Sequence, residues 1–260
     1  MTISPYIKSI GFELECGIPY TKLREFKRHM REKYGDRFEA DTDGSVGAGG
    51  TGYQGGNEYK FYSDKWEEIE DFLKEAYTTY GVKTDRTCGL HMHFKTNPDK
   101  IKMKEAVALL SYKPIHDEFI NEYKTTFQRR QKFLNRLKGR REGGWADPEY
   151  KENEILSQLE ARRKHDVINR YTAINLQAYN EHGTVELRPL PPSATAVGAI
   201  GALKQEVKIL DRVFKKYTTL RDEMELEGSE SSGNKAYTKE ELEAYKDSLE
   251  AEDVNVRMRV

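Results

Sequence analysis

The 260-residue sequence has little cysteine, little net charge and no long hydrophobic run. Its only two cysteines, Cys16 and Cys88, are too few for a disulfide framework, and we expect both to be reduced. The 43 lysines and arginines nearly balance the 44 aspartates and glutamates, so no overall field attracts nucleic acid or an anionic membrane. No apolar run approaches the roughly 18 residues of a membrane-spanning helix. We therefore expect a soluble globular protein without a membrane partner.

Two further absences bear on location and chemistry. Residues 1–9 lack the apolar core of a signal peptide, and together with reduced thiols this indicates a cytoplasmic location. The glycine-rich stretch 47–56 is not followed by Gly-Lys-Ser/Thr, so it is not a P-loop. Two interpretations of this stretch stay open, a lid over a reactive intermediate and a plain flexible loop.

Helical and strand-like segments alternate along the chain. Periodicity predicts helices at 20–34, 64–80, 99–123 (broken before Pro114) and 194–226, and strands at 8–16, 57–63, 82–96, 171–176 and 184–187. The last two strands are expected to form a hairpin that turns at 180–183. Because the strands alternate polar and apolar residues, we predict an α+β fold with an antiparallel sheet and helices packed on one face.

Four predicted strands carry polar residues two positions apart, which places each pair on one face of its strand. The pairs are Glu13 and Glu15, Glu58 and Lys60, His91 and His93, and Glu186 and Arg188. Carboxylates crowd together only when something neutralises them. Magnesium is the natural candidate, because it binds carboxylate oxygens and keeps waters for phosphates, whereas manganese suits a histidine ligand better. One such pair is usually a solvated strand face, but its repetition favours a metal site.

Short segments in this order resemble the amidoligase family, relatives of glutamine synthetase and glutamate–cysteine ligase within the carboxylate–amine ligase superfamily. They are Gly-Phe-Glu-Leu-Glu at 11–15, Asp-Gly-Ser at 43–45, Asn-Glu-Tyr at 57–59, Cys-Gly-Leu-His-Met-His-Phe at 88–94, Arg-Tyr-Thr-Ala-Ile-Asn-Leu at 170–176 and Thr-Val-Glu-Leu-Arg at 184–188. The resemblance covers about the first three quarters of the chain. It implies a glutamine-synthetase-like catalytic domain: a curved antiparallel sheet of about five or six strands, with helices on its convex face and metal-bound ATP on its concave face.

The resemblance also implies roles for individual residues. The implied metal ligands are Glu13, Glu15, Glu58, His91 and Glu186. The residues implied to contact the nucleotide are His93, Arg188, Arg170 and Lys60. The residues implied to meet the substrates are Asp43, Ser45 and Asn175. Glu58, Arg170, Arg188 and Asp43 are the expected catalytic groups. The chain departs from the family pattern at Lys60, whose position on the metal face lets it replace one positive charge.

The implied activity is ATP-dependent amide formation with Mg²⁺ or Mn²⁺. A small-molecule or peptide carboxylate attacks the γ-phosphate, and an amine deprotonated by Asp43 or Glu58 attacks the resulting acyl phosphate. Relatives of glutamine synthetase often build sites across subunits, so a homo-oligomer is one expected state. Two alternatives stay open: an ATP-dependent phosphotransferase on the same fold, and a non-enzymatic module that binds nucleic acid or another partner.

The expected domain organisation is a catalytic domain at 1–227 and a C-terminal arm at 228–260. The domain carries a basic helical insertion at about 124–165, and the arm consists of a linker, an acidic helix at 239–249 and a tail. Segment 124–141 has eight lysines and arginines and no acid. We interpret it as a solvated helix face balanced by the acidic arm rather than as a nucleic-acid site.

The remaining cysteines and histidines receive structural interpretations. Strand parity places Cys88 on the face opposite His91 and His93, so we predict a buried thiol and not a nucleophile. Cys16 has the same interpretation. The other histidines (His29, His116, His165 and His182) are expected on the surface or in turns.

Overall fold

The computed structural model describes residues 3–47, 50–127, 146–161, 171–190 and 192–227. Contacts divide the chain into two units, Met1–Thr218 and Thr219–Val260, and the elements below belong to the first unit apart from the last turns of α8. Among the described residues, no helix has both the length and the hydropathy of a membrane span. The predicted C-terminal arm and most of segment 124–141 lie outside the described residues.

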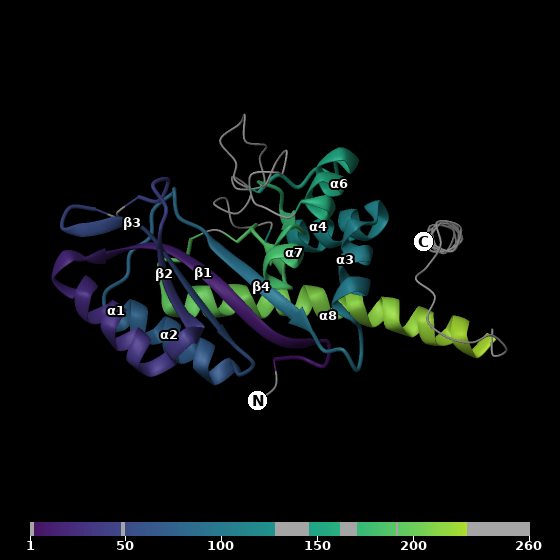
Figure 1. Cartoon of the computed structure of the whole chain (residues 1–260), viewed down its shortest axis with the longest axis horizontal. Coiled ribbons are helices and arrows are strands. Elements are labelled where there is room, and N and C mark those ends of the chain that lie inside the picture. Colours follow the sequence, from purple (N-terminus) through teal and green to yellow (C-terminus); the bar gives the residue numbers. More distant parts are fainter. Residues whose placement is uncertain (1–2, 48–49, 128–145, 162–170, 191, 228–260) are drawn as a thin grey trace. The chain divides into compact units, whose positions relative to one another are not determined.

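The centre of the fold is a six-stranded sheet in the order β2-β3-β1-β4-β6-β5 (Figure 1). The strands are β1 (Ile7–Pro19), β2 (Phe38–Thr42), β3 (Tyr53–Ser63), β4 (Leu90–Thr96), β5 (Ile174–Asn175) and β6 (Val185–Leu187). Every pair of neighbours is antiparallel. This confirms the predicted α+β class and its antiparallel sheet.

Seven α-helices are described around this sheet. They are α1 (Tyr20–Tyr34), α2 (Trp66–Thr78), α3 (Met103–Ser111), α4 (Lys113–Phe127), α6 (Glu152–Glu160), α7 (Ala178–His182) and α8 (Ala196–Glu227). A short 3₁₀ turn, η1 (Gly35–Arg37), links α1 to β2. The predicted break before Pro114 falls between α3 and α4, where proline in the first turn of a helix loses no intrahelical hydrogen bond.

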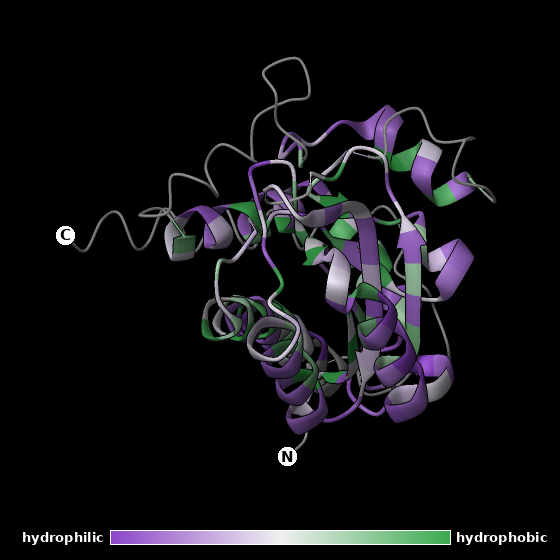
Figure 2. Cartoon of the chain, turned by 90° about the vertical axis from the view of Figure 1, so that its left-hand side faces the viewer, coloured by the Kyte–Doolittle hydropathy of each residue, from purple (hydrophilic) through white to green (hydrophobic). Residues whose placement is uncertain are grey.

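The core lies between the apolar face of the sheet and helices α1, α2 and α8. Phe12 of β1 and Phe61 of β3 pack on Phe72 of α2, with ring centroids 5.2 and 5.0 Å apart. Phe94 of β4 lies 6.0 Å from Phe214 of α8. Figure 2 shows the helices with hydrophobic and hydrophilic residues on different sides. Because helices cover this face, the opposite face of the same strands is left for polar groups.

Two predictions about local structure were wrong. β5 and β6 pair as expected, but the helix α7 joins them in place of a turn at 180–183. Gly183, with φ of 65°, ends this helix in the left-handed conformation that glycine adopts most easily. His116 is buried (1% exposed) and not on the surface, because it shares the helical stripe of Phe119, Ile120 and Tyr123 that packs inward.

Candidate active site

Strand register brings the predicted site residues into rows across the sheet. Glu13 of β1 lies opposite Lys60 of β3 on one side and His91 of β4 on the other. Glu15 lies opposite Glu58. Since cross-strand partners share a face and have Cβ atoms about 5 Å apart, residues far apart in the sequence become neighbours. The central place of β1 is what allows its two glutamates to meet both flanking strands.

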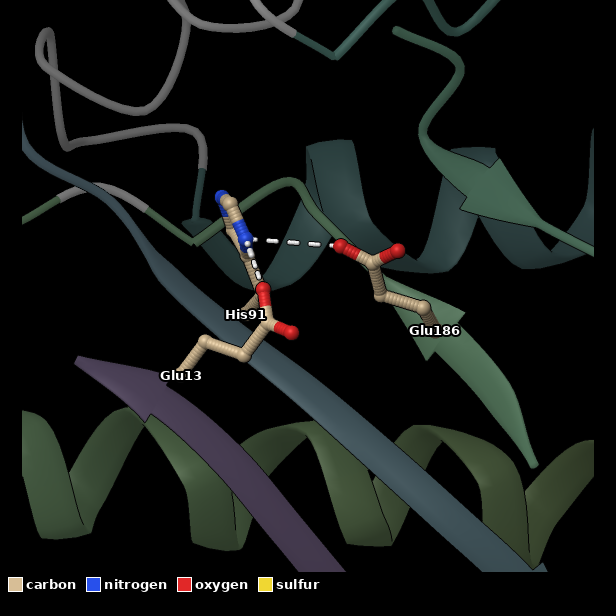
Figure 3. A group of neighbouring side chains, drawn as sticks. All are labelled: Glu13, His91 and Glu186. Carbon is tan, nitrogen blue, oxygen red and sulfur yellow. Dashed lines mark hydrogen bonds and ion pairs between the residues drawn. The ribbon is translucent and has the colours of Figure 1, made fainter. Parts of the chain in front are cut away.

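Three glutamates converge on the buried imidazole of His91 (1% exposed). His91 Nδ1 lies 3.0 Å from Glu13 Oε2 and 3.3 Å from Glu186 Oε1 (Figure 3). Its Nε2 lies 3.7 Å from Glu15 Oε1. Two groups of side chains have ligand atoms within 4.8 Å of one another, namely Glu13, His91 and Glu186, and Glu15, Glu58 and His91. All five predicted metal ligands therefore meet around one imidazole.

The donor set of these groups fits Mg²⁺ or Mn²⁺. Carboxylate oxygens are the ligands that Mg²⁺ takes, and an added imidazole suits Mn²⁺. A neutral imidazole has one acceptor nitrogen and one N–H donor. A neutral His91 could therefore ligate one ion at most, while its other nitrogen would donate to a carboxylate and fix the orientation of the ring.

The local charges keep the central carboxylates ionised. Burial opposes ionisation of Glu13, but hydrogen bonds from His91 and His93 bring its pKa well below the usual value. Burial acts on Glu186 in the same way, and there the positive charge of Arg188 lowers the pKa. Burial also lowers the pKa of His93, but hydrogen bonding to Glu13 outweighs it, and the pKa is raised. The site therefore presents negative charge before any cation arrives.

Glu58 behaves differently from Glu13 and Glu186. Burial raises its pKa, and the nearby charge of Glu13 acts in the same direction, although Lys60 offsets part of the shift. The site therefore contains carboxylates with different proton affinities. Such a difference is typical of catalytic centres that combine ligand and base roles.

Glu186 is held by two neighbours. Arg188 hydrogen-bonds Glu186 Oε1, and Asn175 Nδ2 donates to Glu186 Oε2 over 2.6 Å. The backbone N–H of Gln177 in turn donates to Asn175 Oδ1 over 3.1 Å. These contacts place Asn175 as a support for a predicted metal ligand. The substrate role predicted for Asn175 stays a prediction.

The predicted residues surround a small polar cavity of about 70 Å³. Ten of them line it: Glu13, Glu15, Asp43, Ser45, Glu58, Lys60, His93, Asn175, Glu186 and Arg188. His91 contacts three of the lining glutamates. Arg170 lies outside the described residues. The structure thus brings together every predicted site residue that it describes.

The loop that carries Asp43 is fastened to the next loop of the cavity wall. Asp43 Oδ1 accepts hydrogen bonds from the backbone N–H and the hydroxyl of Ser45, at 2.8 and 2.7 Å. The N–H of Gly47 donates to Thr87 Oγ1. A Cβ at Gly47 would lie 2.1 Å from Asp85 Oδ2, so a larger residue there would displace the Asp85 carboxylate. Asp43 and Ser45 are thereby kept at the cavity.

A second cavity of about 390 Å³ shares Glu13, Lys60, His93 and His182 with the first. Gly11 and the half-exposed Tyr62 also line it. A Cβ at Gly11 would lie 3.3 Å from Tyr62 Cβ, so the glycine keeps this part of the strand open. The two cavities together make the polar site continuous with a larger, more apolar space.

Sequence reasoning missed several residues of the site. The hydroxyl of Thr184 lies 3.1 Å from His93 Nδ1, and Thr87, Tyr171, Gln177, Glu181 and His182 also line the polar cavity. Thr184 could have been found, since strand parity puts it on the face of Glu186 and Arg188. His182 was assigned to the surface, and its exposed side chain nevertheless borders the cavity.

The cysteines follow the prediction. Both are buried thiols outside any disulfide. Burial raises the pKa of Cys16 well above its usual value and the pKa of Cys88 to about 12. Because the thiolate is the nucleophile, neither thiol is activated near neutral pH.

A family model described as "Putative amidoligase enzyme" matches residues 59–203, which is more than half of the chain. No curated protein and no solved structure matches the sequence. The matched range contains His91, His93, Asn175, Glu186 and Arg188. Glu13, Glu15 and Asp43 lie outside it, so their position beside the matched residues is a finding of the structure alone.

Proposed function

This chain belongs to the amidoligase family and is therefore a ligase, and we propose that it joins a carboxylate to an amine in a reaction that depends on ATP and a divalent metal ion. One observation carries the proposal. Glu13 and Glu15 of β1, outside the matched range, meet His91 and Glu186 inside it to form a carboxylate–imidazole cluster, in which the pKa values of Glu13 and Glu186 are lowered. A solvated strand face would not require this convergence.

The chain's own residues provide positions for each part of this reaction. Glu13, His91 and Glu186, with Glu15 beside them, would hold Mg²⁺ or Mn²⁺. A bound ion would neutralise the phosphates and align the γ-phosphoryl group. The second cavity, at about 390 Å³, offers room for the rest of a nucleotide. Arg188, on the cavity wall, would stabilise charge on the transferring group.

Amide formation then needs a proton acceptor for the amine. The carboxylate of the first substrate takes the γ-phosphoryl group, releasing ADP and giving an acyl phosphate. The amine attacks the acyl carbon, loses a proton, and displaces inorganic phosphate. Asp43 and Glu58 both line the cavity where this proton would be taken up. The raised pKa of Glu58 suits it to accept a proton near neutral pH.

The test traps the acyl phosphate chemically. Purified protein is incubated with ATP, Mg²⁺ or Mn²⁺, hydroxylamine and a pool of amino acids, peptides and other small carboxylates. We expect a hydroxamate and an equal amount of free phosphate, both lost in Glu186→Ala. The matched control is Glu149→Ala, which removes an exposed glutamate (71% exposed side chain) and is expected to leave the signal unchanged.

Other outcomes would redirect the assignment. A stable phosphorylated product without hydroxamate would favour the phosphotransferase alternative. ATP consumption that persists in Glu186→Ala would contradict the metal assignment. Salt-sensitive binding to nucleic acid that is unaffected by Glu186→Ala, without ATP turnover, would support a binding module.

A further inference from the structure

A lysine lies among the carboxylates of the polar face. Lys60 Nζ is 2.8 Å from Asp41 Oδ2, 3.1 Å from Glu58 Oε1 and 3.9 Å from Glu13 Oε1. Register explains the contacts, since Lys60 lies opposite Glu13 of β1, and Asp41 of β2 lies opposite Glu58. The ammonium group is thus bound by acids from three neighbouring strands.

The position of this ammonium conflicts with a divalent ion beside Glu58. Glu58 belongs to the group of Glu15, Glu58 and His91 that could hold an ion. Any ion ligated by Glu58 would lie within a few ångströms of the ammonium, and like charges at about 4–6 Å disfavour one another. His91, which both candidate groups share, offers one acceptor nitrogen, so an ion beside Glu58 would be held by Glu15 and Glu58 alone. Lys60 lies farther from the group of Glu13, His91 and Glu186, at 3.9 Å from Glu13 Oε1, and the cation that contacts this group directly is Arg188, at Glu186.

We propose that Lys60 is a built-in cation that takes the place of a divalent ion beside Glu58, so that the chain binds one metal ion fewer than its carboxylates would otherwise hold. The inference rests on the proposed metal-dependent function. In the absence of nucleotide it assigns one ion, to Glu13, His91 and Glu186. Asp41 acts as a positioning residue that holds the ammonium in this place.

A covalently attached cation differs from a bound ion in one respect that can be tested. It cannot dissociate, so the charge beside Glu58 is present at every metal concentration. Removal of the charge should open a position for an additional ion. The matching variants are Lys60→Met, which removes the charge at similar length, Lys60→Gln, which keeps polar contacts, and Lys60→Arg, which keeps the charge. Lys8→Met, at an exposed lysine of β1, is the control.

The experiment counts Mn²⁺ ions bound per full-length chain. Free Mn²⁺ is measured by electron paramagnetic resonance during titration of each protein without nucleotide. We expect the wild type, Lys60→Arg and Lys8→Met to bind one ion, and Lys60→Met and Lys60→Gln to bind two. Adding Glu58→Gln to either neutral variant should return the count to one. Circular dichroism establishes whether each variant is folded. If Lys60→Met does not fold, Lys60→Gln provides the test of the uncharged side chain.

The outcomes separate this inference from the proposed function. If the wild type and both neutral variants bind the same nonzero number of ions, the assignment of Lys60 is wrong while the metal-dependent function stands. If no protein binds Mn²⁺ at all, the proposed metal dependence is wrong and the inference falls with it. One additional ion in both neutral variants, removed by Glu58→Gln, supports the assignment.

Discussion

Two buried glutamates in different regions of the molecule differ in charge. Glu186 on β6 is 5% exposed and Glu206 on α8 is fully buried. Burial raises the pKa of both, but Arg188 and the site histidines more than reverse this effect at Glu186. At Glu206 burial raises the pKa well above its usual value, and the hydrogen bond from the Tyr123 hydroxyl offsets only part of this effect. The sheet therefore holds an anion, and the helical packing holds a neutral acid.

This comparison shows that the neighbours of a buried acid decide its chemistry. A buried carboxylate is ionised only where fixed positive charge surrounds it. At Glu186 that charge comes from the polar face of the sheet, and the residue is ionised as the proposed metal site requires. At Glu206 the hydrogen-bond donor is the hydroxyl of Tyr123, so the residue serves packing and hydrogen bonding.

The largest expected effect is on enzymatic activity, which substitution of Glu186 should lower and substitution of Glu206 should not. Glu186→Gln removes an anion from the proposed metal site, and we expect hydroxamate formation to fall by about 10³-fold, roughly 4 kcal/mol. Glu206→Gln removes no charge and is expected to keep the wild-type rate. The two rates are measured under the same conditions. A Glu186→Gln enzyme with more than a tenth of the wild-type rate would contradict the proposed role of Glu186 as a metal ligand.

The next effect comes from removing the cation that keeps Glu186 ionised. Arg188→Met leaves a buried carboxylate without its partner, which costs about 3–5 kcal/mol of unfolding free energy at neutral pH. The folded-state pKa of Glu186 then rises above its unfolded value, so the loss is small at pH 4 and grows as the pH rises. Urea unfolding of the wild type and Arg188→Met at several pH values measures the loss of unfolding free energy. The double variant Arg188→Met/Glu186→Gln should recover much of the loss, and failure to do so would point to lost packing instead.

A smaller effect concerns the neutral acid in the helices. The folded-state pKa of Glu206 is raised above its ordinary value of 4.5, so its contribution to stability is complete below that value and is lost as the pH rises. Glutamine has no proton to lose. Between pH 5 and pH 8 we expect the free energy of unfolding of Glu206→Gln to rise by about 1–3 kcal/mol relative to that of the wild type. Taking the difference between the two proteins cancels the other titrating groups, and a difference independent of pH would contradict the assignment.

The smallest expected effect tests a support of the site. Thr184→Val removes the hydroxyl that contacts His93, and we expect a two- to tenfold lower kcat with less than about 1 kcal/mol of lost stability. Thr184→Ser keeps the hydroxyl and should restore the rate. A wild-type rate in Thr184→Val beside a lower rate in Thr184→Ser would show that the methyl group, not the hydrogen bond, matters.

Strand periodicity predicted which polar residues share a face because it depends on one local rule. Residues two apart share a face, so Glu13 and Glu15, or His91 and His93, could be grouped without any knowledge of pairing. The family resemblance then indicated which residues from different strands belong to one site. What periodicity could not supply was register, which decides that Asp41 meets Glu58 and reaches Lys60.

The failures have two physical causes. His116 looks like a polar position on a helix, but it faces inward and packs against Tyr150, which lies 34 positions later in the sequence. Glu206, for which no prediction was made, is also buried by a long-range contact. Glu206 meets Tyr123, 83 positions earlier in the sequence. The helix α7 was missed because five residues carry too little periodic signal to tell a helix from a turn.

The order of the strands has a consequence for biosynthesis. β1 is made first, yet it lies inside the sheet, between β3 and β4. Until both are translated, a strand bearing Phe12, Leu14 and Ile18 has unpaired edges that invite association with other chains. Glu13 precedes Glu186 by 173 positions, so at about 5–20 residues per second roughly 9–35 s of translation separate them. The nascent chain therefore carries its first carboxylates long before the histidines, Glu186 and Arg188 that surround them in the folded chain have been made.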